Sequence, residues 1–151
     1  MGKFFGTYER NLDAKNRLLL PSKMMGEMPL RLYLLRGFEG SLSLYPEEAF
    51  NAYIEGLQKL SYLDSKARSY VRLAAGSVLP LDVDSHNRIT IPQEIKTRYK
   101  LGEEVVILGA IDHMEIFDKK AYVDYVRQEE GRYEEIADSL AHLGDKDGNA
   151  L

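Results

Sequence analysis

The sequence predicts a β-rich α+β fold built from two similar halves, each with its own helices. The first observation is that one segment occurs twice, as DAKNRLLLP at residues 13–21 and as DSHNRITIP at residues 84–92. The second is that an alternating apolar pattern, typical of half-buried strands, follows the arginine of each copy. The third is that the same order of strand and helix signals follows each copy. An internal duplication accounts for all three observations.

Each copy of the repeated segment begins with the residues of a tight turn. Aspartate is favoured at the first position of a type I turn, where its carboxylate accepts hydrogen bonds from backbone N–H groups two residues later. Asp13 and Asp84 occupy that position. Asparagine is one of the few residues that tolerate a left-handed backbone, and Asn16 and Asn87 end the two turns. We therefore expect each turn to join two antiparallel strands as a hairpin, shaped by its aspartate and asparagine.

The strand that follows each turn has a core face and an outer face. Leu18 and Leu20 alternate with Arg17 in the first copy, as Ile89 and Ile91 do with Arg88 in the second. Each arginine should therefore point away from the core, close to the aspartate of its own turn. The simplest interpretation of this pair is a surface ion pair, which contributes little to stability.

The first half is expected to contain four strands and one long helix. Residues 21–30 hold two prolines and a glycine, so they allow at most a short helical turn. Pro46 should occupy the first position of the long helix, with acidic residues in its first turn. The expected strands are 4–12, the segment ending at Leu20, 32–35 and 42–45, and the apolar face of the helix runs from Ala49 to Leu60.

The second half repeats this order after a connecting helix at residues 64–75. Its expected elements are a strand at 79–83, the strand after the second turn, a short helix at 93–100, strands at 104–108 and 114–117, and a helix capped by Asp118. A last helix at 133–143 precedes a tail expected to be disordered. We divide the chain into a first repeat (1–60), a connecting helix (61–75), a second repeat (76–130), and a C-terminal helix with a flexible acidic tail (131–151).

Composition restricts the class of protein. The chain has no cysteine, which excludes disulfides and thiolate metal sites, and no apolar run approaches the about 20 residues that span a bilayer. Residues 1–5 lack the longer apolar stretch of a signal peptide, so we expect a cytoplasmic protein. The net charge is −4, but residues 1–23 carry five Lys or Arg against two acids, whereas residues 124–151 carry three against eight. One end of the chain is therefore locally basic.

The small size of each half favours assembly. Four short strands barely bury a core, and their outer edges remain open to pairing. We expect the two halves to pack into one pseudo-symmetric unit whose remaining apolar surface promotes association of several chains. A symmetric assembly of such units closes naturally into a ring.

The duplicated D-x-x-x-R unit resembles the signature of the MraZ family of bacterial regulators. The N-terminal FFGTY segment and the Leu-Pro or Ile-Pro after each motif also fit the resemblance, which covers about residues 4–143. Asp13 and Arg17 match the first motif, and Asp84 and Arg88 match the second. Family members often have glycine before the motif arginine. Asparagine stands there in this chain and can adopt the same backbone conformation.

The resemblance implies a fold, an assembly and a function. The fold is two tandem AbrB-like half-units of the swapped-hairpin type, with flanking helices and a pseudo-two-fold axis within the chain. The assembly is a ring-shaped homo-oligomer, for which an octamer is one candidate. The function is sequence-specific binding of double-stranded DNA at short repeated boxes upstream of the family's own operon, in the division and cell-wall gene cluster. Such a protein would be associated with the nucleoid, and the position of the boxes would decide between activation and repression.

The chemistry of the motifs allows roles to be assigned for DNA binding. A guanidinium can bind guanine O6 and N7 as a bidentate fork or clamp a phosphate, so Arg17 and Arg88 are expected to make the strong contacts. Asp13 and Asp84 should orient these arginines rather than touch DNA. The first copy, with the greater positive charge, should dominate. Phosphate contacts are expected from Lys15, Arg10 and Lys3, and His86 lies at the tip of the second turn.

Two other classes of function remain as alternatives. An enzyme would have to use His113, the one histidine with acids close by, but strand alternation predicts that Asp112 lies on the opposite face. No nucleophile elbow, phosphate-binding glycine loop or His-x-x-x-His motif is present. We therefore expect no catalytic residues, no metal, no cofactor and no small-molecule substrate. The remaining alternative is a non-catalytic, ring-forming protein-interaction or antitoxin-like module.

Overall fold

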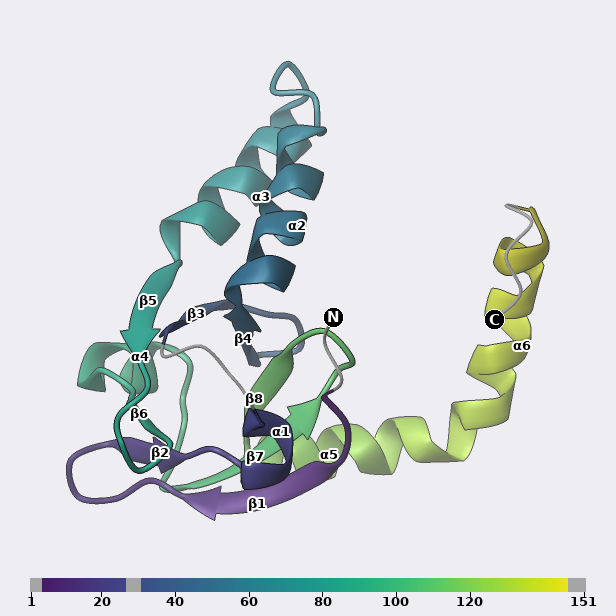
Figure 1. Cartoon of the computed structure of the whole chain (residues 1–151). Coiled ribbons are helices and arrows are strands. Elements are labelled where there is room, and N and C mark those ends of the chain that lie inside the picture. Colours follow the sequence, from purple (N-terminus) through teal and green to yellow (C-terminus); the bar gives the residue numbers. More distant parts are fainter. Residues whose placement is uncertain (1–3, 27–30, 147–151) are drawn as a thin grey trace. The chain divides into compact units, whose positions relative to one another are not determined.

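The computed structural model describes residues 4–26 and 31–146, with side chains to residue 141. The chain divides into two units, residues 1–119 and residues 120–151. Among the described residues, the first unit contains all the strands and the four helices that lie between them (Figure 1). The second consists of helices. The tail was expected to begin at residue 144, but the last helix continues to Lys146, so that boundary was wrong. Residues 147–151 of the expected tail and Lys3 lie outside the described residues.

The first unit is organised around an antiparallel sheet of six strands. In spatial order these are β1 (Thr7–Asn11), β7 (Glu104–Gly109), β8 (Met114–Asp118), β4 (Leu42–Pro46), β3 (Arg31–Arg36) and β5 (Leu79–Asp82). Every neighbouring pair is antiparallel. With the helices described below, this arrangement confirms the mixed α+β class predicted from the sequence.

The order of the strands is symmetric about the β4–β8 pair. Read from the opposite edge, the order is the same with each strand exchanged for its counterpart in the other half of the chain: β1 for β5, β7 for β3 and β8 for β4. The first strand of each half therefore pairs with the third strand of the other half: β1 pairs with β7, and β5 pairs with β3. The two halves share one sheet and one hydrophobic core.

A second, two-stranded sheet also combines the halves. It consists of β2 (Arg17–Leu19) and β6 (Arg88–Thr90), which run antiparallel (Figure 1). The turns before these strands lie where the sequence predicts them. The strands on either side of each turn do not pair with each other, however, so the predicted hairpins are wrong. Backbone bonds such as Asp13 N to Arg17 O close each turn locally, yet β2 continues alongside β6 rather than alongside β1. Pairing between the halves buries Leu18 and Ile89, which explains the preference.

The helices of the first unit also follow the expected order. Asp64 caps α3, and its carboxylate accepts hydrogen bonds from the N–H groups of Lys66 and Ala67. Pro46 does not begin the long helix as expected; it ends β4, and α2 starts at the next residue. The helices are α1 (Ser22–Met25), α2 (Glu47–Gln58), α3 (Ser65–Gly76) and α4 (Gln93–Arg98).

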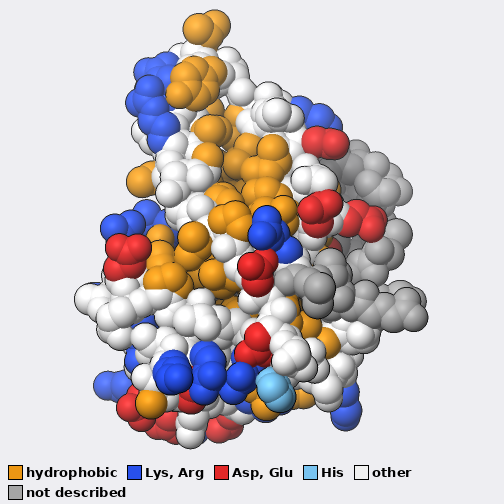
Figure 2. All heavy atoms as spheres, turned by 60° about the vertical axis from the view of Figure 1, so that its left-hand side comes forward, with side chains coloured by type: hydrophobic (Ala, Val, Ile, Leu, Met, Phe, Trp, Pro, Cys, Tyr) orange, Lys and Arg blue, Asp and Glu red, His pale blue; other side chains and the backbone are white. Residues whose placement is uncertain are grey.

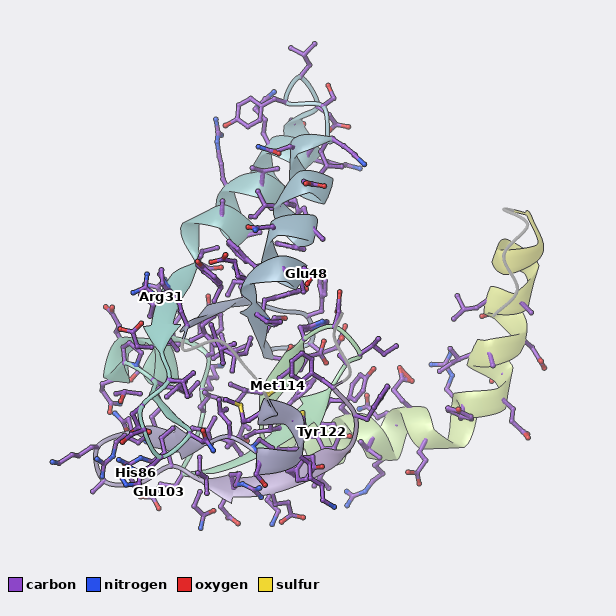
Figure 3. All side chains as sticks on the ribbon, in the orientation of Figure 1. Arg31, Glu48, His86, Glu103, Met114 and Tyr122 are labelled. Atoms are coloured by element: carbon purple, nitrogen blue, oxygen red, sulfur yellow. The ribbon has the colours of Figure 1, made fainter. Side chains whose placement is uncertain are left out.

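The hydrophobic core lies between the large sheet and the β2–β6 pair. It draws almost equally on both halves of the chain, and Met114 lies in its interior (Figure 3). Its fully buried side chains include Leu18, Leu20, Leu32, Leu34, Leu42, Leu44, Ile89, Ile91, Ile107, Met114 and Ile116. A core of this kind requires both repeats to be present.

The second unit follows β8 in the sequence. It contains α5 (Lys119–Glu129), the 3₁₀ turn η1 (Glu130–Arg132) and α6 (Tyr133–Lys146). Its ion pairs follow the helical spacing, as in Arg127 with Asp124 and Arg132 with Glu129. Within residues 4–26 and 31–146, no helix combines the length and apolar character that crossing a membrane requires.

Glycine is required at position 109, where the chain entering β1 passes close by. A Cβ built on Gly109 would lie 2.3 Å from the carbonyl carbon of Phe4, and the Gly109 N–H donates to the Gly6 carbonyl at 2.9 Å. By contrast, a Cβ on Gly56 in α2 would meet nothing within 4 Å. The backbone therefore leaves no room for a side chain at position 109, whereas position 56 has room for one.

We expect Gly109→Ala to destabilise the protein by about 1–3 kcal/mol, because backbone cannot move aside as a side chain can. Gly56→Ala is the matched control and should stabilise by about 0.5–1 kcal/mol, since alanine loses less entropy in a helix. Denaturant unfolding of both variants is the measurement. Equal effects of the two substitutions would contradict the close approach at Gly109.

Candidate nucleic-acid interface

The candidate interface is the outer face of the β2–β6 pair, which we call the ribbon (residues 17–19 and 88–90). Arg17 pairs with Thr90, and Arg88 pairs with Leu19. Directly paired residues project from the same face of a sheet, so these four side chains share one face. The other face carries Leu18 and Ile89, which are 0% and 1% exposed. The burial of one face thus fixes which side chains the ribbon presents to solvent.

The antiparallel register brings together two motifs that lie 71 residues apart. Arg17 and Arg88 come from equivalent positions and lie diagonally across the ribbon, each next to its own turn. Leu19 is 47% exposed and lies beside both of them, two residues from Arg17 and directly opposite Arg88. Sequence reasoning did not select Leu19 or Thr90, although the same alternation that turns the arginines outward places them on that face.

In the first turn, Asp13 holds both the backbone and the arginine. Its Oδ1 accepts hydrogen bonds from the N–H groups of Lys15 and Arg17, both at 2.9 Å. Its Oδ2 accepts from Arg17 Nε at 2.6 Å. A guanidinium held through Nε still presents its two Nη groups, which can donate to a base edge or to a phosphate.

The second turn repeats this geometry almost without change. Asp84 Oδ1 accepts from the N–H groups of His86 and Arg88 at 2.8 and 2.9 Å, and Oδ2 accepts from Arg88 Nε at 2.8 Å. The asparagines at the ends of the turns are left-handed, with φ of 59° for Asn16 and 60° for Asn87. Both arginines are therefore held in equivalent positions at opposite ends of the ribbon.

The asparagines also connect each turn to the other half of the chain. The Asn16 carbonyl accepts from Ile91 N–H and the Asn87 carbonyl accepts from Leu20 N–H, each at 2.9 Å. These bonds extend the ribbon ladder by one step at either end. The position of each turn therefore depends on the pairing of the ribbon.

The environment of the two aspartates stabilises their ionised forms. The backbone hydrogen bond from Arg17, opposed by desolvation and reinforced by the Arg17 side chain and Lys15 N–H, lowers the pKa of Asp13 to about 2. For Asp84, desolvation raises the pKa, but the hydrogen bonds from Arg88 and His86 outweigh it and leave the pKa below its ordinary value. Both carboxylates remain charged at neutral pH.

The first turn has neighbours that sequence reasoning missed. Asn16 Nδ2 donates to Gln93 Oε1 at 3.1 Å, and Lys96 Nζ donates to Asn16 Oδ1 at 3.3 Å. Gln93 and Lys96 lie on α4, so this helix adds a cation beside the first turn. No sequence pattern indicates this contact, because it joins residues about 80 positions apart.

The other predicted residues are distributed unevenly. Lys15 and His86 are exposed at the tips of the two turns, and Figure 3 shows His86 at the end of the first unit that carries the ribbon. Arg10 lies on β1 of the large sheet, where its Nη1 donates to the Glu9 carbonyl and its guanidinium lies over the Tyr8 ring. Figure 2 shows lysine and arginine side chains gathered in a band low on one face, beside a histidine.

The environment of His113 differs from the sequence-based expectation. Asp112 does not lie on the opposite face: His113 Nδ1 is 2.7 Å from Asp112 Oδ1, and Nε2 is 3.3 Å from Glu115 Oε2. The expectation was wrong because β8 begins only at Met114, so strand alternation does not apply to the preceding turn. Desolvation lowers the pKa of His113, but hydrogen bonds to Glu115 and Asp112 outweigh it and raise the pKa.

These contacts give His113 the surroundings of a structural residue. Its side chain is only 15% exposed, and its ring stacks on Tyr45 at 4.4 Å. Both ring nitrogens are occupied by carboxylates. In the part of the chain that the structure describes, no three His, Cys, Asp or Glu side chains are grouped so as to hold a metal ion.

Comparison with known proteins identifies relatives over almost the whole chain. A family model described as "MraZ protein, putative antitoxin-like" matches residues 3–73 and 79–142. The two matched segments correspond to the two halves of the strand order.

Individual relatives match over nearly their full length. A protein of Mesoplasma florum is 36% identical over 138 residues, covering 91% of this chain and 94% of the relative. A protein of Mycoplasmoides gallisepticum is 35% identical over 137 residues, covering 91% and 96%. One of Ureaplasma parvum serovar 3 is 33% identical over 140 residues, also covering 91% and 96%. Each is named "Transcriptional regulator MraZ".

The hydrogen bonds of the first turn predict how the stability of the protein depends on pH. Because the pKa of Asp13 is lower in the folded than in the unfolded state, the ionised carboxylate stabilises the fold above about pH 4. This contribution is lost as the pH falls from about 4 to about 2. Asp13→Asn should therefore destabilise the protein at pH 7, and the difference from the wild type should shrink below pH 3.

NMR titration of the Asp13 carboxyl provides the direct measurement, with an expected midpoint of about 2. In the Arg17→Ala variant the midpoint should rise part of the way towards 3.8, since the backbone bonds remain. A wild-type midpoint at the ordinary value would contradict the turn geometry.

Proposed function

This chain belongs to the MraZ family, and from that premise we propose that it is a transcriptional regulator that binds double-stranded DNA through the ribbon. The observation that carries the proposal is the pair of arginines on the outer face of the ribbon, each oriented by an aspartate. Their equivalent geometry in two distant motifs favours a shared role.

The two-stranded form of the ribbon suits the major groove of DNA. That groove admits a two-stranded β-ribbon, and arginine bound to guanine O6 and N7 is the commonest specific contact in it. Arg17 and Arg88 would supply these contacts through their free Nη groups. The exposed Leu19 side chain beside them is of the apolar kind that contacts a thymine methyl group.

Cations around the ribbon would contact phosphates. Lys15 lies at the tip of the first turn, and Lys96 lies beside it on α4. We keep Arg10, Lys3 and His86 as proposed backbone contacts. The two aspartates would not touch DNA, because a carboxylate beside a phosphate is repelled. Their role is to hold each turn and its arginine.

We propose further that the protein acts as a homo-oligomer. A chain of net charge −4 offers few DNA contacts, but an assembly repeats the same ribbon. When repeated ribbons match repeated DNA boxes, weak contacts combine into avidity. A ring of subunits bound to short boxes upstream of its own operon, in the division and cell-wall gene cluster, fits this requirement.

The fold proposed for this function is a duplicated AbrB-type swapped hairpin. Two features of the topology support it: the first strand of each half pairs with the other half, and the ribbon takes one strand from each. A single chain would then form the unit that in an unduplicated protein needs two copies.

An antitoxin-like protein-interaction module is the second candidate. It is favoured by the description of the family model and by exposed apolar side chains in the first unit, including Phe38, Leu63 and Leu73. Retention on DNA at moderate salt, compared with capture of a protein partner, separates the two functions.

The first test is binding to the DNA upstream of the protein's own gene, measured by gel shift at several salt concentrations. If cations around the ribbon contact phosphates, the logarithm of the affinity should fall linearly with the logarithm of the salt concentration. Shuffled DNA of the same length is the control. Equal affinity for both DNAs, or affinity insensitive to salt, would count against the proposal.

The second test compares the two arginines. A base-contacting arginine contributes about 1–3 kcal/mol, roughly 5- to 150-fold in affinity at each site, and an assembly multiplies the loss. Arg17→Ala should abolish detectable specific binding, and Arg88→Ala should weaken it less, because Lys15 and Lys96 accompany only Arg17.

Arg31→Ala serves as the matched control, since Arg31 pairs with Asp82 on the large sheet and lies outside the ribbon. Mass and circular dichroism of each variant should equal those of the wild type. A larger loss of DNA affinity in Arg88→Ala than in Arg17→Ala would mean that the second turn makes the main DNA contact.

A further inference from the structure

The first unit has a groove that the ribbon does not use. It lies between the β3–β4 turn, α3 and the C-terminal end of α4, with a volume of about 800 Å³. None of its lining residues belongs to β2, β6 or the two Asp–Arg turns. The proposed DNA contact therefore leaves this groove unexplained.

The lining of the groove is apolar and aromatic. Phe38, Tyr70, Leu73 and Tyr99 contribute to it, and the Phe38 and Tyr70 rings are nearly parallel, with centroids 6.4 Å apart. Phe38 is 66% exposed and Leu73 is 57% exposed. Figure 2 shows apolar side chains gathered on one face of the molecule above the basic band. Exposed aromatic and leucine side chains grouped in this way mark interaction surfaces.

Positive charge surrounds this lining. Arg36, Arg72, Arg98 and Lys100 contribute to the groove, against the single acid Glu39. Within the described residues, none of these four cations forms an ion pair. The groove thus suits a segment that is both apolar and acidic.

Helix α6 of the second unit has that composition. Tyr133, Ile136 and Leu140 follow the spacing of one helical face. Glu134, Glu135 and Asp138 occupy other sides, and residues 133–141 contain no Lys or Arg. Tyr133 is 76% exposed and Leu140 is 43% exposed.

Helix α6 also needs a surface on which to pack. From residue 120 to residue 141, no side chain of the described second unit is buried. Isolated helices of this length are marginal in water, so most helical stability comes from packing of the apolar face. A partner that covers Ile136 and Leu140 would supply it.

We propose that the groove is the docking site for α6 of a second copy of this chain. This inference rests on the self-association proposed above and identifies the two surfaces that make it. The apolar face of α6 lies against Phe38, Tyr70 and Leu73. Its carboxylates approach the arginines around the groove, whose long side chains can reach the flanks of the helix.

The interface uses two different surfaces. Each chain offers one groove and one α6, so each copy binds one neighbour through its groove and another through its helix. Such a head-to-tail contact closes into a ring when the rotation between copies permits and otherwise extends as a filament.

Three variants test the inference by light scattering of the full chain. Arg72→Glu with Arg98→Glu disables the groove, and Ile136→Asp with Leu140→Asp disables the helix. Each should lower the mass from that of the wild-type oligomer to the 17.2 kDa of the single chain. Lys59→Glu with Lys66→Glu makes the same charge change on exposed residues of the first unit outside the groove, and should leave the mass unchanged. Circular dichroism verifies that each variant is folded.

Mixing the groove variant with the helix variant gives the sharpest result. The mixture retains one intact groove and one intact helix, so it should form a complex of twice the chain mass and no larger. Formation of this dimer supports the inference, because the intact helix of one variant then binds the intact groove of the other. Two variants that remain monomers when mixed overturn it.

The outcomes also separate this inference from the proposed function. A wild-type protein of 17.2 kDa would overturn both self-association and the docking site. A wild-type oligomer that survives both pairs of substitutions would overturn the docking site alone. Loss of assembly in the lysine control as well would assign the effect to net charge and likewise overturn it.

Discussion

The structure of the first unit depends on the pairing of β2 with β6. Each of these short strands carries one core residue on one face and an arginine on the other, and neither pairs within its own half. Their pairing buries Leu18 and Ile89, satisfies the carbonyls of Asn16 and Asn87, and fixes both turns. Without it, the arginines would have no common face and the core would lose one of its two layers.

Within each turn, one carboxylate performs two tasks. It binds the N–H groups of the turn, which offsets the cost of a left-handed asparagine, and it orients the arginine. Because both tasks require the ionised form, the same hydrogen bonds that shape the backbone lower the pKa of the aspartate. The local fold and the exposed guanidinium are therefore set by a single side chain. Because one aspartate performs both tasks, both motifs contain the Asp–Arg pair with the same spacing.

Local features of the structure could be predicted from the sequence, whereas the partners of its strands could not. The turns and the strands after them follow from a few adjacent residues. Hydrogen bonding between strands uses backbone groups that every residue except proline has, so the sequence did not reveal that β1 pairs with β7 and β2 with β6. The hairpins were predicted wrongly for this reason.

In the candidate site, too, the local features could be predicted from the sequence and the long-range contacts could not. Arg17 and Arg88 follow from the repeated motif, but Lys96 joins the first turn only through tertiary structure. His113 was misjudged because the chain leaves the extended conformation before β8, with φ of 78° at Ile111. Where the backbone departs from a regular element, alternation no longer tells which side chains meet.

The exchange of strands between the halves also has a consequence during synthesis. The strand at residues 7–11 pairs with residues 104–108, so most of the chain must be translated before β1 has its partner. At about 5–20 residues per second, several seconds separate the synthesis of the two strands. Throughout that interval the nascent first half exposes unpaired edges on crowded polysomes, where a neighbouring nascent chain offers the same strands. Duplication within one polypeptide places the correct partner on the same ribosome, which favours pairing within one chain over pairing between two.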